Sequence, residues 1–176
     1  MNLFMKDDPD YFLELVKDWE DPWPDPVIEE YDKINVVRDD LLNYGSKVRF
    51  IDYYIKTLPK SIKEVVFGNC PATGYAQISL PIVCKKYGKK AVLFMAKRRM
   101  DKLHPYQTRG MKEGAIYNWV KMGMLSVTKA HAKKYVEERP NERVILPLGL
   151  EHPTVLGSII KVARKTITTP PSEILS

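Results

Sequence analysis

Three short stretches of this chain are almost continuously apolar, and segments with helical spacing separate them. The apolar stretches are EVVFG at 64–68, KAVLFMA at 90–96 and RVILPL at 143–148. A strand of this kind offers no face to water and must be covered on both sides, as in the parallel sheets of α/β proteins. We therefore expect a three-layer α/β fold, in which a parallel or mostly parallel sheet has helices on both faces. The intervening spacing predicts helices at 74–87, 105–113 and 127–138.

The remaining predicted elements are two helices and two short strands, the helices at 46–57 and 152–165 and the strands at 34–38 and 115–119. Ser46 is expected to cap the first helix and Pro153 to open the second. Pro81 falls inside the 74–87 helix, where it should kink the helix or end its first half.

The first 32 residues have the pattern of an arm that packs on the domain. A helix is predicted to begin at Asp8-Pro9-Asp10 and to run to Trp19, and three prolines then occur within residues 21–26. Such a proline-rich segment cannot be helical, and tryptophans on either side are typical anchors for an arm. The predicted division is an arm at 1–32, an α/β domain at 33–168 and a tail at 169–176.

Composition excludes several classes of protein. The 176 residues include 28 basic and 22 acidic side chains, which gives a net charge of +6. The excess lies in short lysine clusters near predicted helix ends, so we expect a solvated surface and not a nucleic-acid interface. No apolar run approaches the roughly 20 residues of a membrane helix, and no secretory signal is evident. The two cysteines have no neighbours at metal-ligand spacing, so no metal site is expected, and the expected location is cytoplasmic.

Three strand ends carry small and polar residues and are candidate ligand sites, because open parallel sheets bind ligands beyond the carboxyl ends of their strands. They lie at 38–49, 68–77 and 149–154. In the third, Glu151 is a candidate to orient a substrate amine and His152 to shuttle protons. The alternative is that both residues cap the following helix.

Several segments, in this order, resemble fold-type II pyridoxal-phosphate (PLP) enzymes of the tryptophan synthase beta superfamily. The segments are RDDLLNYGSKVRFIDYYI, EVVFGNCPATGYAQ and RVILPLGLEHPTVLGSIIKVA. The similarity is greatest to the branch of aminocyclopropane-carboxylate deaminase and D-cysteine desulfhydrase, and it covers about residues 34 to 170. Lys47 matches the lysine of the family motif, Arg49 the arginine after it, and Ser46 replaces the asparagine before it.

The resemblance implies that Lys47 forms a Schiff base with pyridoxal 5'-phosphate. An amine reacts in this way only when it is unprotonated, and the positive end of a helix dipole favours that form. The alternative is an ordinary surface lysine. The loop of Asn69, Thr73, Gly74 and Tyr75 would hold the cofactor ring and the substrate carboxylate, with Thr73 and Tyr75 taking catalytic roles. The family's loop asparagine is lost unless Asn69 substitutes for it, and an ordinary turn is the alternative.

The implied function is a lyase or deaminase that acts on a small amino acid. The sequence stops near 170–176, about where the family's Gly-rich phosphate-binding loop would follow, and offers no such loop elsewhere. The interpretation is therefore a half-enzyme that needs a complementary second polypeptide, or a homo-oligomer. The alternative is a non-catalytic interaction or assembly module derived from a PLP-enzyme domain.

Overall fold

A four-stranded parallel sheet forms the centre of the computed structural model, which describes residues 8–121 and 124–167. The strand order is β5-β4-β3-β6, and every neighbouring pair is parallel. The strands are β3 (Glu64–Phe67), β4 (Lys90–Ala96), β5 (Ile116–Val120) and β6 (Arg143–Ile145). The tail predicted at 169–176 lies outside the described residues.

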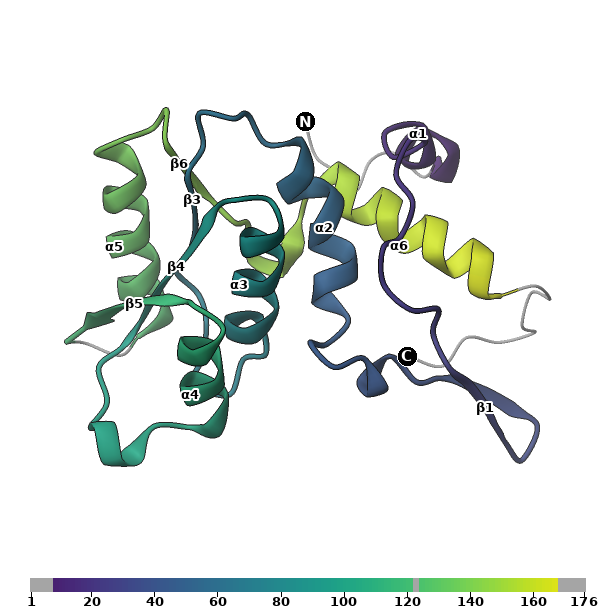
Figure 1. Cartoon of the computed structure of the whole chain (residues 1–176), viewed down its shortest axis with the longest axis horizontal. Coiled ribbons are helices and arrows are strands. Elements are labelled where there is room, and N and C mark those ends of the chain that lie inside the picture. Colours follow the sequence, from purple (N-terminus) through teal and green to yellow (C-terminus); the bar gives the residue numbers. More distant parts are fainter. Residues whose placement is uncertain (1–7, 122–123, 168–176) are drawn as a thin grey trace.

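Helices cover both faces of this sheet (Figure 1). α5 lies on one face, whereas α2 and α3 lie on the other, with α4 against α3. α6 packs on α2, and α1 packs on α6. The fold class predicted from the sequence is confirmed. The helices are α1 (Pro9–Glu14), α2 (Lys47–Thr57), α3 (Ala76–Lys86), α4 (Pro105–Lys112), α5 (Leu125–Glu137) and α6 (Pro153–Thr166).

The continuous apolar runs are explained by the two cores that the sheet separates. Alternate side chains of a strand point to opposite faces. Val65 and Leu93 therefore pack with α2 and α3, whereas Val66 and Val92 pack beneath α5. All four side chains are fully buried. A polar residue at any of these positions would have no water to face.

The strand predicted at 34–38 is present, but it lies outside the central sheet. β2 (Ile34–Val37) pairs with β1 (Ile28–Tyr31) in an antiparallel hairpin that projects from the body (Figure 1). Asp32 and Lys33 form its turn, both with positive φ. A two-residue turn of this conformation matches the twist of a hairpin and returns the chain upon itself. The hairpin joins residues on both sides of the boundary predicted at residue 32.

Two local expectations are wrong. Ser46 occupies the N-cap position of α2, but its side chain makes no capping hydrogen bond. Its backbone is already helical, and a capping side chain needs an extended backbone to reach the first-turn N–H groups. α3 does not end at Pro81, which lies buried inside the continuous helix.

Buried charges on α2 fasten the segment that follows α1. Arg49 is 1% exposed; its guanidinium pairs with Asp21 and donates to the carbonyl oxygen of Pro24 at 2.8 Å. Asp52, also 1% exposed, accepts hydrogen bonds from the Trp19 indole at 3.1 Å and from Lys86 at 2.7 Å. A buried charge is tolerated only when it is paired and hydrogen-bonded. These bonds fix the path of the chain around α2.

α6 holds the other side of the same segment. The ammonium group of Lys161 donates to the carbonyl oxygens of Lys17 and Trp19 at the end of the arm's helical region. Gly157 allows close approach, because a Cβ there would lie only 2.3 Å from the carbonyl oxygen of Phe12. The arm is therefore packed between α2 and α6.

Replacing Asp52 with alanine should destabilise the protein by about 2 to 4 kcal/mol, because the substitution leaves the Trp19 N–H without its acceptor and Lys86 without its partner. Urea unfolding followed by tryptophan fluorescence measures the loss. Glu137→Ala, which removes one member of an exposed ion pair, is the control and should cost far less. Equal losses in the two variants would contradict this account of the arm.

Candidate functional site

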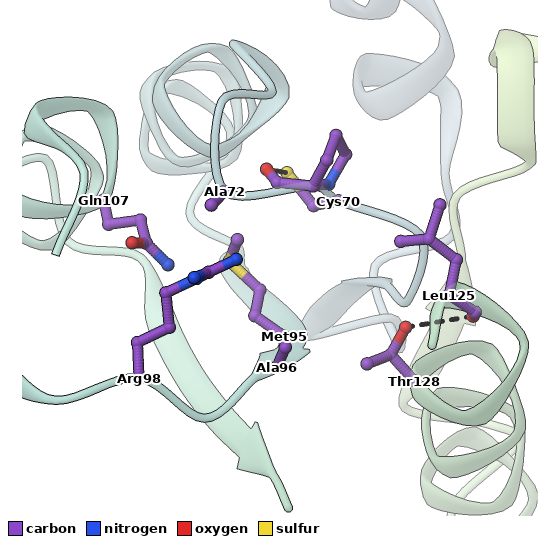
Figure 2. Close-up of a pocket in the computed structure, with 9 residues that line it drawn as sticks. Cys70, Ala72, Met95, Ala96, Arg98, Gln107, Leu125 and Thr128 are labelled. Carbon is purple, nitrogen blue, oxygen red and sulfur yellow. Dashed lines mark hydrogen bonds between the residues drawn. The ribbon is translucent and has the colours of Figure 1, made fainter. Parts of the chain in front are cut away.

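A cavity of about 180 Å³ lies at the carboxyl edge of the sheet, where the sequence analysis placed ligand binding (Figure 2). The ends of β3 and β4, one side of α4 and the start of α5 enclose it. No group of three or more possible metal-ligating side chains occurs within the described ranges. The residues that line the cavity are Cys70, Pro71, Ala72, Met95, Ala96, Arg98, Gln107, Leu125 and Thr128.

The turn after β3 forms one wall of the cavity and is held rigidly from within. The N–H of Gly74 donates to the carbonyl oxygen of Pro71 at 2.8 Å. The fully buried amide of Gln77 donates to the carbonyl oxygens of Ala72 and Gly74, each at 2.8 Å. Because both carbonyl groups are held by one side chain of α3, the turn has a fixed shape before any ligand arrives.

Cys70 presents a neutral thiol to this wall. Burial raises the pKa of the Cys70 thiol to about 11, against smaller opposing effects from the Gln77 N–H and the positive charge of Lys47. The thiol is therefore protonated near neutral pH and is not a nucleophile there. The effect of Lys47 on this pKa also places the Lys47 ammonium group near the turn.

Lys47 is the first residue of α2 and its side chain is exposed. It forms no hydrogen bond or ion pair with any residue that the structure describes, and it does not line the cavity. The backbone just before it packs against the turn, because a Cβ on Gly45 would lie 2.6 Å from the ring of Tyr75. The structure thus brings Lys47 to the side of the 70–75 turn, with its amine uncommitted.

The predicted residues of the turn differ in their surroundings. Thr73 is exposed, whereas Asn69, Gly74 and Tyr75 are half-buried. The hydroxyl of Tyr75 accepts a hydrogen bond from Arg109 at 3.1 Å and lies 3.4 Å from the carbonyl oxygen of Asn43. Tyr75 therefore ties the segment before α2 to α4, and its hydroxyl is already occupied.

Glu151 and His152 are not brought to Lys47 by any described contact. His152 is the N-cap of α6, where its Nδ1 accepts from the N–H of Thr154 at 3.3 Å. Its ring packs on Tyr54, roughly two turns along α2 from Lys47. Glu151 is exposed. The geometry of His152 is the helix-capping arrangement that the sequence analysis gave as the alternative.

Sequence reasoning missed Arg98, Gln107 and Thr128 in the cavity wall. Arg98 belongs to a basic cluster that was interpreted as solvated surface, and nothing in the local sequence sets it apart. Gln107 follows the pattern His-Pro-x-Gln, and together with His104 it forms a capping box at the start of α4. That pattern predicts a cap, but it does not reveal which other element buries the side chain.

The comparisons with known proteins show a fold and no family. No family model and no curated protein matches this chain. Among solved structures, the crystal structure of an ACC deaminase homologue matches with a TM-score of 0.70 and 16% sequence identity. The match covers 92% of this chain and 54% of that chain, so this chain spans about half the length of its structural neighbour. The chain has the fold of this part of a fold-type II PLP enzyme.

No helix in the described part of the chain is long and apolar enough to cross a membrane.

The cap at His152 should make the protein less stable in mild acid. Burial lowers the pKa of His152 below its ordinary value of 6.5. Below that value the unfolded chain binds a proton that the folded chain does not, so stability falls as pH drops from 7 to 5. His152→Asn keeps a good N-cap residue and should lose less stability over this range, as measured by urea unfolding at each pH.

The exposed His131 supplies the control for the loss of one histidine. His131→Asn should keep the acid sensitivity of the unmodified protein. If the pH dependence of His152→Asn matched that of the unmodified protein, the assignment to His152 would be wrong.

Proposed function

We propose that this chain is the lysine-bearing half of a PLP-dependent lyase or deaminase that acts on a small amino acid. The observation that carries the proposal is the position of Lys47: an uncommitted amine at the start of a helix, beside a rigid turn, in a fold shared with an ACC deaminase homologue. Bound PLP supplies an electron sink for the carbanion formed when a bond at the substrate Cα breaks.

Lys47 fits the aldehyde end of this cofactor. Its amine is open to solvent, and no described carboxylate holds it as an ammonium ion. Other lysines of the chain are engaged, such as Lys86 on Asp52 and Lys161 on the arm. The helix dipole at the start of α2 favours the neutral amine that the linkage needs.

The turn supports the proposal at two residues. The hydroxyl of Thr73 is exposed at the carboxyl edge and is available to donate to a substrate carboxylate. Gly74 keeps the turn tight, because a Cβ there would lie 3.0 Å from Pro71 and 3.1 Å from the sulfur of Cys70. We propose Asn69 as a further polar contact to the cofactor ring, whereas the hydroxyl of Tyr75 positions the turn through Arg109.

A second polypeptide, or a second copy of this chain, completes the proposed site. PLP is anchored chiefly through its phosphate, which backbone N–H groups of a Gly-rich loop hold in many enzymes. The matched region corresponds to about half of the structural neighbour. We propose that the phosphate cradle comes from outside the matched region.

The alternative function, an interaction module without catalysis, is favoured by the β1–β2 hairpin. Ile28, Tyr31 and Ile34 are each about half exposed on it, at 47%, 54% and 53%. Exposed apolar side chains grouped on a projecting hairpin are typical of a surface that contacts another protein. This role does not require Lys47.

Incubation with substoichiometric PLP followed by borohydride reduction should label Lys47 more than any other lysine, because its amine is accessible and unpaired. Peptide mass spectrometry locates the label. Lys47→Arg should abolish the main labelled peptide, whereas Lys56→Arg, an exposed position on the same helix, should not. Preferential labelling of a different lysine would exclude Lys47 as the cofactor lysine and leave the interaction module as the better account.

A further inference from the structure

The side chain of Gln107 is fully buried, yet one of its two polar atoms has no partner. Its Oε1 accepts a hydrogen bond from the N–H of His104 at 2.9 Å. Because that N–H can only donate, the oxygen must face it and the amide nitrogen must point the other way. This nitrogen, Nε2, is buried without a hydrogen-bond partner among the described residues. An unpaired buried donor is costly, and native proteins seldom keep one without a reason.

The unpaired nitrogen points into the cavity at the carboxyl edge, toward Arg98 (Figure 2). The guanidinium of Arg98 lies in the same space, between Gln107 and the turn at 70–72 (Figure 2). Arg98 forms no hydrogen bond or ion pair with any described residue. Its neighbour Arg99, in contrast, is paired with Asp101 at 2.8 Å. Two groups of donors therefore meet in the cavity without an acceptor.

The start of α5 adds to this positive potential. Leu125 and Thr128, in its first turn, line the cavity. The N-cap residue, Met124, provides no side-chain hydrogen bond to the first-turn N–H groups. The positive end of the helix dipole therefore faces the cavity without a capping acceptor.

Nothing in the wall neutralises these donors. None of the nine lining residues is acidic. The Cys70 thiol is protonated, since burial raises its pKa to about 11. The hydroxyl of Thr128 donates to the carbonyl oxygen of Leu125 at 3.0 Å, so it contributes no negative charge. The remaining wall, which includes Pro71, Met95 and Ala96, is mostly apolar.

We propose that this cavity binds the carboxylate of a small organic acid, with the Gln107 amide and the Arg98 guanidinium as its donors. Both groups are planar donors that suit the two coplanar oxygens of a carboxylate. The apolar part of the wall accommodates a short hydrocarbon portion, and the volume of about 180 Å³ restricts the acid to a few heavy atoms beyond the carboxylate. The site needs neither Lys47 nor a cofactor.

Titration of the full chain with acetate, propionate and pyruvate in chloride-free buffer tests the site. The ¹⁵N-labelled side-chain amide of Gln107 should shift saturably, and its signal is identified by its loss in Gln107→Glu. That variant keeps an oxygen to accept from His104 but places a negative charge in the cavity, so it should abolish binding. Absence of saturable binding of all three acids would overturn the proposal.

Arg98→Gln should weaken carboxylate binding by about ten-fold or more, because a charge-assisted hydrogen bond is lost. Arg99→Gln removes the same charge from the adjacent position and should change the dissociation constant less than about two-fold, as expected for a screened surface charge. Since Arg98 is exposed, its variant tests the site even if Gln107→Glu fails to fold. Equal effects of the two arginine substitutions would reduce the binding to general electrostatic attraction and overturn the site.

Two further arms separate the possible outcomes. Inorganic phosphate that bound more tightly than every carboxylate would overturn the choice of carboxylate. Lys47→Arg should leave carboxylate binding unchanged, so failure of the cofactor linkage at Lys47 and failure of this site are distinguishable. Loss of carboxylate binding in Lys47→Arg would contradict the assignment to Arg98 and Gln107.

Discussion

The arrangement depends most on a pair of buried charges, Arg49 and Asp52, one turn apart on α2. Each is satisfied only when the arm lies across the helix, because Asp21, Pro24 and Trp19 supply the partners. Burial of an unpaired charge is strongly unfavourable, so these bonds select one position of the arm over others. They also fix α2 itself, and Lys47 stands at the start of that helix. The position of the proposed reactive amine is thus set by contacts on the far side of the helix that carries it.

The carboxyl edge combines rigid and uncommitted groups. The 70–74 turn is held by Gln77, and Tyr75 ties it to α4 through Arg109. Beside this fixed scaffold, the donors of Lys47, Arg98 and Gln107 have no acceptor among the described residues. A preorganised scaffold with unused donors is the arrangement expected of a binding site, since a ligand then recovers hydrogen bonds without ordering the protein. The fold explains why this edge, and not the opposite one, carries them.

The sequence predicted the sheet well because burial on both faces leaves a local trace: nearly every residue of the 64–67 and 90–96 strands is apolar. The hairpin partner of β2 was missed because Asp32-Lys33 lacks the glycine that usually marks such a turn. The site was harder to predict. Lys47 and the turn were found through a family resemblance. Gln107 became visible only when α4 was packed against the cavity, because its burial comes from residues distant in sequence.

The contact between α1 and α6 joins the earliest and the latest helices of the described chain. During synthesis, the arm leaves the ribosome well before the helix that supplies Gly157 and Lys161. Until that helix emerges, Trp19 has only part of its final surroundings, and the apolar side of the arm stays open to water or to a chaperone. Closing this contact requires a loop that spans nearly the whole chain, and such long-range contacts slow folding. Docking of the arm is therefore expected among the last events of folding.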